Sequence, residues 1–122
     1  MKAAIIAGSR TPFVVANSAF AKLSAVDLGK EAVRDALARS GLPGSRVNHV
    51  VYGTVVSDTQ APNIAREVGL AVLPKNVPAV SVSRACASAN QAITGAAEMI
   101  EMGYADVVIA GGGESLSRIP IT

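Results

Sequence analysis

The chain has few aromatic residues and few charges, and these shortages exclude several classes of protein. Among its 122 residues there is no tryptophan, and the four aromatic side chains are Phe13, Phe20, Tyr52 and Tyr104. Lysine and arginine number 11 against 9 aspartates and glutamates, a formal net charge of +2. Nucleic-acid binding requires basic clusters beside aromatic residues on which bases stack. The composition therefore excludes a nucleic-acid-binding protein.

Long apolar runs and paired cysteines are also missing. The longest stretch without a charged residue, residues 85–97, is shorter than the ~20 apolar residues that a membrane span requires. The single cysteine, Cys86, cannot form an internal disulfide. We therefore expect a reducing compartment, the cytoplasm, and a free thiol at Cys86. One cysteine and one histidine, without a carboxylate at ligand spacing, predict no metal site.

What the sequence does contain is apolar residues, at 50%, and 11 glycines. Low charge combined with this apolar content is typical of strands that are buried on both faces, because such strands have no solvated side. The length is enough for one α/β core and leaves no room for a second domain of ordinary size. Residues 1–122 are therefore expected to form one domain, or part of one.

The order of apolar runs predicts alternating strands and helices. Strands are expected at residues 2–8, 47–56, 77–82 and 105–110. Helices are expected at residues 24–40, 62–73 and 88–102. Ser24 and Asp27 form a capping-box pair at the start of the first helix, Gly41 ends it, and Pro62 is expected in the first turn of the second. This β-α-β-α-β-α-β order predicts right-handed crossovers and a parallel sheet.

The third expected helix is unusual because small residues cover much of its circumference. These are Ala87, Ala89, Ala92, Gly95, Ala96 and Ala97. Small side chains allow other elements to approach a helix closely from several directions. The pattern therefore predicts a central and largely buried helix.

Cys86 stands at the expected junction between the third strand and this helix. In a parallel α/β sheet, the loops at the carboxyl ends of the strands face the functional crevice. The amide groups and dipole at a helix start favour a thiolate by roughly 0.3 to 1 kcal/mol. The position favours a nucleophile, and it is also compatible with an inert cysteine that packs as a small apolar residue.

Two other residues are candidates to assist Cys86. Arg84 precedes it by two residues and either adds positive potential, points outward or pairs with a carboxylate such as Glu67 or Glu114. His49 is the only histidine and the only side chain that ordinarily titrates near neutrality. It stands at the start of an expected strand, whereas the thiol follows the end of one. We therefore expect it at the opposite end of the strands from the thiol and not as its base.

The glycine run at residues 111–113 does not predict a nucleotide site. It lacks the lysine of a phosphate loop and the glycine spacing of dinucleotide-binding proteins. We expect these glycines to let the backbone pass close to the buried helix or to a substrate.

Four motifs, in collinear order along the whole chain, resemble the thiolase family. They are RTPF at residues 10–13, APNIARE at 61–67, SVSRACASANQA at 81–92 and ADVVIAGGGESLSR at 105–118. The second motif is similar to the branch of β-oxidation thiolases that includes the β subunits of trifunctional complexes. Small departures are Ala89 and Leu116, where members of the family often have glycine and methionine.

The resemblance implies a layered α/β fold and an acyltransferase with Cys86 as its nucleophile. In thiolases this cysteine attacks a 3-ketoacyl-CoA, acetyl-CoA leaves, and the shortened acyl group passes to coenzyme A; the reverse reaction condenses acetyl-CoA. The resemblance thus implies fatty-acid β-oxidation, coenzyme A thioesters as substrates and no bound cofactor. It also implies a homo-oligomer or a complementary thiolase half as partner.

The largest departure concerns residues that thiolases carry in later segments. These are a histidine that activates the nucleophile and a second cysteine that acts as acid and base. His49 does not match that histidine motif, and there is no second cysteine. The resemblance therefore implies an amino-terminal half-domain, residues 1–122, whose full cycle needs further residues.

Two alternatives to a thiolase stay open at this point. One is a non-catalytic half-domain that dimerises or assembles through the strand at residues 77–82, which would be an exposed sheet edge. The other is a related family with a similarly placed cysteine, such as the ketoacyl synthases or hydroxymethylglutaryl-CoA synthases.

Overall fold

Three parallel strands form the centre of the computed structural model, which describes residues 2–119. The strand β1 (His49–Gly53) lies between β2 (Ala79–Val82) and β3 (Val108–Gly112), so that the order is β2-β1-β3. Both pairings are parallel, with Val51 opposite Val80 on one side and Ala110 on the other. The predicted parallel sheet is therefore confirmed.

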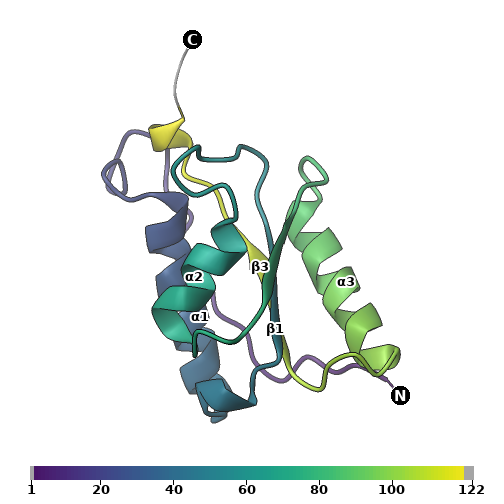
Figure 1. Ribbon diagram of the computed structural model, residues 1–122. Coiled ribbons are helices and arrows are strands. Elements are labelled where there is room, and N and C mark those ends of the chain that lie inside the picture. Colours follow the sequence, from purple (N-terminus) through teal and green to yellow (C-terminus); the bar gives the residue numbers. More distant parts are fainter. Residues whose placement is uncertain (1, 120–122) are drawn as a thin grey trace.

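Helices cover both faces of this sheet (Figure 1). The helices α1 (Ala25–Ser40) and α2 (Ile64–Val72) lie on one face, and α3 (Ser88–Glu101) lies on the other. Two short 3₁₀ helices span Gly44–Arg46 and Leu116–Arg118. None of the helices within residues 2–119 combines the length and the apolar character needed to cross a membrane.

The side chains of β1 alternate between the two layers. Val50 and Tyr52 belong to the cluster formed with α1 and α2. Val51, between them, packs against Ala92 and Ala96 of α3. Because successive side chains of a strand point to opposite faces, β1 is buried on both sides, as its apolar sequence predicts.

The helix α1 begins and ends at the predicted residues. The Oγ of Ser24 accepts the N–H of Asp27 at 3.1 Å, and the Asp27 carboxylate accepts the N–H of Ser24 at 2.9 Å. This hydrogen bond from the Ser24 backbone is the main reason why the pKa of Asp27 lies below its ordinary value. At the other end, Gly41 adopts the left-handed conformation with φ 73°, which terminates the helix.

Asn63, and not the first-turn proline of the prediction, starts α2. Its Oδ1 accepts the N–H of Arg66 at 3.2 Å and the hydroxyl of Ser81 at 2.6 Å. Its Nδ2 donates to the carbonyl oxygen of Ala79 at 3.2 Å. Pro62 therefore lies one position before the cap. These bonds fasten α2 to β2, the strand that leads to Cys86.

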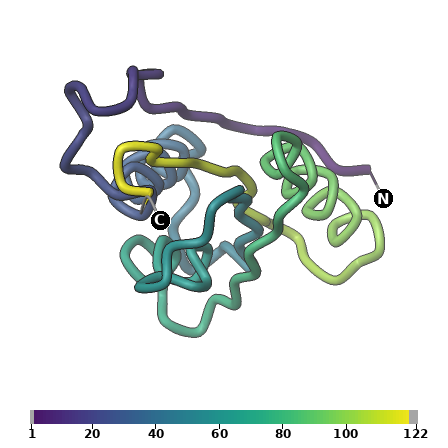
Figure 2. Tube along the Cα trace, turned by 90° about the horizontal axis from the view of Figure 1, so that it is seen from above, coloured from purple at the N-terminus to yellow at the C-terminus, as the bar shows by residue number. Residues whose placement is uncertain are grey.

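The predicted first strand, residues 2–8, is wrong. This segment crosses the molecule from the side of α3 to the side of α1 without pairing with any strand of the described residues (Figure 2). Ile5 and Ile6 are 83% and 67% exposed. An apolar run becomes a strand only where a sheet edge satisfies its backbone N–H and C=O groups. The element order within residues 2–119 thus begins with α1 and contains three strands instead of four.

The predicted burial of the small-residue helix is confirmed for one face and wrong for the others. Ser88, Ala92 and Ala96 are buried, whereas Ala89 is exposed and Ile93 is 42% exposed. Small residues permit close approach, but burial also requires a neighbouring element. Among the described residues, α3 packs extensively only against the three strands of the sheet.

Candidate functional site

Cys86 lies in the loop that joins β2 to α3, at the carboxyl end of the parallel sheet. The strand ends at Val82 and the helix begins at Ser88, with Ala87 as its N-cap. The side chain of Cys86 is exposed. The predicted location, at the handover from strand to helix, is therefore confirmed.

The side chain of Ser88 closes this loop. Its Oγ accepts the N–H of Arg84 at 2.8 Å and donates to the carbonyl oxygen of Ala85 at 2.6 Å. The N–H of Ser88 donates to the same carbonyl at 3.1 Å, and the N–H of Ala87 donates to the carbonyl of Arg84 at 3.0 Å. The residues on both sides of Cys86 are thus tied to one another.

Ala85 carries backbone strain immediately before Cys86. Its φ of 46° lies in the left-handed region, which costs a residue with a Cβ roughly 1 to 2 kcal/mol. Such conformations persist where surrounding bonds enforce them, and they are frequent at functional sites. The two hydrogen bonds accepted by the Ala85 carbonyl are the enforcing contacts here.

The first turn of α3, which begins two residues after Cys86, contains unpaired amides. In the part of the chain that the structure describes, the N–H groups of Ala89 and Asn90 have no protein acceptor, and no side chain caps this helix. Such groups, together with the helix dipole, stabilise negative charge. The exposed thiol therefore lies in the loop that enters a helix start with free donors.

Glycines let the sheet approach this first turn closely. A Cβ on Gly53 would lie 2.6 Å from the backbone C and O atoms of Ser88. A Cβ on Gly112 would lie 2.8 Å from the carbonyl oxygen of Gly53 and 3.0 Å from the Cβ of Ala89. The expectation that the glycine run allows close approach to the helix is confirmed at Gly112.

Glu114 organises the neighbouring loop, which follows β1. Its Oε1 accepts the hydroxyl of Thr54 at 3.0 Å and the N–H of Val55, and its Oε2 accepts the N–H of Val56 at 3.4 Å. Burial and, to a smaller extent, the negative charge of Glu114 raise the pKa of Tyr52 to about 12. The carboxylate thus holds the loop after β1 by hydrogen bonds and raises the pKa of a tyrosine in the core.

We expect Glu114→Gln to lower the pKa of Tyr52 slightly, because burial, its main cause, is unchanged. The variant should also lose about 1.5 to 3 kcal/mol of unfolding free energy, the range for hydrogen bonds to charged groups. Because the folded-state pKa of Tyr52 is raised, its contribution to stability is complete below pH 10 and is lost as the pH rises through 12. Alkaline titration of phenolate absorbance and urea unfolding measure both effects. Tyr52→Phe, which removes the titration, is the control, and an unchanged stability would contradict the role given to Glu114.

Arg84 is held by an amide and not by a carboxylate. Its Nη1 donates to the Oε1 of Gln91 at 2.9 Å, one turn into α3. Neither Glu67 nor Glu114 forms an ion pair with it within the described residues. The guanidinium therefore stays exposed on the same loop as Cys86.

His49 lies at the opposite end of the strands from Cys86, as predicted. It begins β1, whose carboxyl end is Gly53, and its Nδ1 lies 3.0 Å from the carbonyl oxygen of Val50. Since all three strands run in the same direction, the amino end of β1 and the loop after β2 are at opposite ends of the sheet. His49 is therefore not placed to take a proton from Cys86.

Sequence reasoning missed the two residues that shape this site, Ser88 and Asn63. Both stand at the start of a helix, where serine and asparagine are favoured because they hydrogen-bond free backbone groups. That preference could have identified Asn63 as a cap. It could not have shown that Ser88 bonds backward to Arg84 and Ala85.

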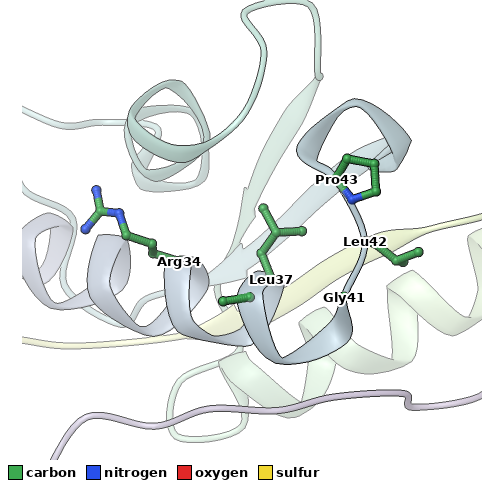
Figure 3. Close-up of a pocket in the computed structure, with 6 residues that line it drawn as sticks. Arg34, Leu37, Gly41, Leu42 and Pro43 are labelled. Atoms are coloured by element: carbon green, nitrogen blue, oxygen red, sulfur yellow. The ribbon is translucent and has the colours of Figure 1, made fainter.

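Two hollows in the surface lie away from Cys86. One, of about 480 Å³, is lined by Arg34, Leu37, Ala38, Gly41, Leu42 and Pro43 (Figure 3). The other, of about 310 Å³, is lined by Ser45, Val47, Asn48, Pro74, Asn76 and Val77. Both adjoin segments that lead into the amino ends of strands. Within residues 2–119, no group of three or more histidine, cysteine or acidic side chains could hold a metal ion.

Comparison with sequence families gives a match over nearly the whole chain. Residues 3–122 match the family described as "Thiolase, N-terminal domain". The 3-ketoacyl-CoA thiolase of Vibrio cholerae is 45% identical over 121 residues, which are 98% of this chain and 28% of that protein. The 3-ketoacyl-CoA thiolase of Yersinia pestis is 46% identical over 118 residues, 96% of this chain and 27% of that protein.

Solved structures agree with these matches. The acetyl-CoA acetyltransferase of Bacillus anthracis superposes with a TM-score of 0.94 at 33% identity, covering 97% of this chain and 30% of that one. Acat5 thiolase from Ascaris suum, solved in complex with coenzyme A, gives 0.93 at 36% identity, covering 96% and 31%. The chain therefore spans less than a third of the length of these relatives.

Proposed function

The chain belongs to the thiolase family, and on this premise we propose that Cys86 accepts the acyl group of a coenzyme A thioester. The substrate class follows from the relatives, which are named 3-ketoacyl-CoA thiolases and acetyl-CoA acetyltransferase. Membership of this family decides against the ketoacyl synthase and hydroxymethylglutaryl-CoA synthase alternatives.

In the proposed reaction the Cys86 sulfur attacks the ketone carbonyl of a 3-ketoacyl-CoA. A carbon–sulfur bond forms, the adjacent carbon–carbon bond breaks, and acetyl-CoA leaves after taking up a proton. The acyl group is then transferred from Cys86 to the thiol of free coenzyme A. Dividing the reaction through a thioester is covalent catalysis, and the reverse sequence condenses two acyl units.

The observation that carries this proposal is an exposed thiol in the loop that leads into the first turn of α3, where backbone amides are unpaired. Cys86 lies two residues before α3, and the N–H groups of Ala89 and Asn90 are unbonded within residues 2–119. Donors placed where an oxyanion develops are a large source of rate enhancement in acyl transfer. The geometry supports a nucleophile better than an inert cysteine, which would be expected in the core.

The proton transfers need groups that Cys86 does not have beside it. His49 is at the opposite end of the strands, and there is no second cysteine. We propose that residues 1–122 make the amino-terminal part of a thiolase, and that a histidine and a cysteine beyond these residues, or in a partner chain, complete the cycle. We place the enzyme in β-oxidation in the cytoplasm, with no bound cofactor, where the lone Cys86 stays reduced.

A second candidate function is assembly without catalysis. Among the described residues, β2 pairs only with β1, so its other edge is free, and Val80 on it is 42% exposed. A free edge strand can pair with a second copy of the same strand or with a complementary half. A homo-oligomer formed in this way is compatible with catalysis as well.

Mass spectrometry of the intact chain after incubation with acetyl-CoA tests the proposed function. We expect slow addition of one acetyl group, which digestion locates at Cys86, and its transfer back to added coenzyme A. Coenzyme A without an acyl group is the control and should leave no acetyl adduct. A chain that stays unmodified, yet forms dimers by light scattering, would contradict the proposal and favour the assembly function.

A further inference from the structure

Ser88 is a buried polar residue whose hydroxyl is fully used beside Cys86. It is 4% exposed, and its Oγ both accepts the N–H of Arg84 and donates to the carbonyl of Ala85, at 2.8 and 2.6 Å. Both backbone groups lie on the amino-terminal side of the cysteine. The hydroxyl therefore bridges from the first residue of α3 to the chain that enters the turn.

This bridge acts on the strained residue of the turn. Ala85 has φ 46°, a conformation that alanine rarely adopts and glycine adopts freely. Its carbonyl accepts the Ser88 hydroxyl and, at 3.1 Å, the Ser88 N–H. Removing the hydroxyl would leave the N–H of Arg84 without an acceptor and the Ala85 carbonyl with one bond. The left-handed conformation would then lose much of its support.

Ser88 is itself held in place by the sheet. The close approach of Gly53 puts β1 directly against the backbone of Ser88, so that even one added methyl group would meet it at 2.6 Å. The turn is therefore fixed to the end of β1 through Ser88, and not only to its own helix. A rigid support of this kind can determine where the neighbouring thiol lies.

We propose that Ser88 is a positioning residue for Cys86. Its hydroxyl holds the turn through Ala85 in its left-handed conformation and so fixes where the Cys86 sulfur lies in the loop that enters α3. This inference rests on the proposed function, because acylation of Cys86 is the reaction that the positioning serves.

The first test compares the acylation of three variants by acetyl-CoA. In Ser88→Ala we expect the maximal rate to fall about 10- to 100-fold, with an unchanged half-saturating concentration, since the hydroxyl faces backbone and not solvent. Ser88→Thr keeps the oxygen and should recover most of the rate. Ser83→Ala alters an exposed serine of the same loop and should have no effect. A Ser88→Ala rate equal to that of Ser83→Ala would overturn the proposal.

A double variant tests whether Ser88 acts through Ala85. Glycine at position 85 adopts the left-handed conformation without the alanine penalty, so Ala85→Gly combined with Ser88→Ala should restore part of the rate. A double variant no faster than Ser88→Ala would overturn this account. Hydrogen exchange in the wild-type chain needs no variant: the Arg84 amide should be protected, and fast exchange there would show that the hydroxyl does not hold it.

Alkylation of Cys86 by iodoacetamide separates this proposal from the proposed function, because the reagent requires no recognition of coenzyme A. If the wild-type chain accepts no acyl group, the proposed function fails, and alkylation decides the role of Ser88. We expect Ser88→Ala to be alkylated at a rate that differs measurably from that of the wild type, because loosening the turn moves the Cys86 sulfur. An alkylation rate equal to that of the wild type would overturn the positioning role.

Discussion

Cys86→Ser is expected to lower the rate of acyl transfer from acetyl-CoA by about 100-fold or more relative to the wild-type chain. A cysteine has a few per cent of reactive thiolate near pH 7, whereas a serine hydroxyl depends on a base. No histidine is available at this end of the sheet to act as that base, since His49, the single histidine, begins β1 at the other end. The measurement is the incorporation of labelled acetyl groups per chain over time.

A relocated thiol provides the matched control for this prediction. The double variant Cys86→Ser with Ser83→Cys keeps one exposed thiol in the same loop, three residues away and outside the turn closed by Ser88. It should be alkylated by iodoacetamide but acylated far more slowly than the wild type. Equal acylation of the relocated thiol would mean that any exposed cysteine exchanges with the thioester and that the position of Cys86 carries no function.

Gly53→Ala is expected to destabilise the fold by about 2 to 4 kcal/mol. The new Cβ would lie 2.6 Å from the backbone C and O atoms of Ser88, and two packed backbones cannot move apart as a flexible side chain can. Folded domains have about 5 to 15 kcal/mol of total stability, so this is a substantial part. Thermal unfolding should show a midpoint lowered by roughly 10 to 20 °C.

Gly95→Ala is the control for the glycine substitution. Gly95 lies within α3, and a Cβ there would meet nothing within 4 Å. Alanine should therefore stabilise the helix by about 0.5 to 1 kcal/mol. If Gly53→Ala were as stable as the wild type, the close contact between β1 and the start of α3 would not exist in solution. The anchoring of the Cys86 turn to the sheet would then lose its basis.

The boundaries of α1 and the place of Cys86 were predictable because they depend on residues close in sequence. The capping box of Ser24 and Asp27 and the left-handed Gly41 involve groups within one turn of the helix that they bound. The short apolar run before Cys86 and the helix formers after it likewise define a strand and a helix locally. Thiolase membership was readable for the same reason, since its motifs are short and contiguous.

The long-range contacts of the site were not predictable. Glu114 meets Thr54 across 60 residues, and Asn63 meets Ser81 across 18. No periodicity or spacing in the sequence indicates such pairs. The same holds for Gly53, whose contact with Ser88 depends on how β1 and α3 pack.

What the sequence by itself determined is therefore the three helices, the three strands that pair, their parallel α/β arrangement and the position of the thiol between β2 and α3. The tertiary structure alone decided which elements obtain partners: within residues 2–119, the segment 2–8 pairs with no strand, α3 is buried on one face, and Ser88 closes the turn around Cys86. The physical reason is that caps and hydrophobic periodicity act over a few residues. Strand pairing, helix burial and side-chain bridges require a neighbour that only the folded chain brings within reach.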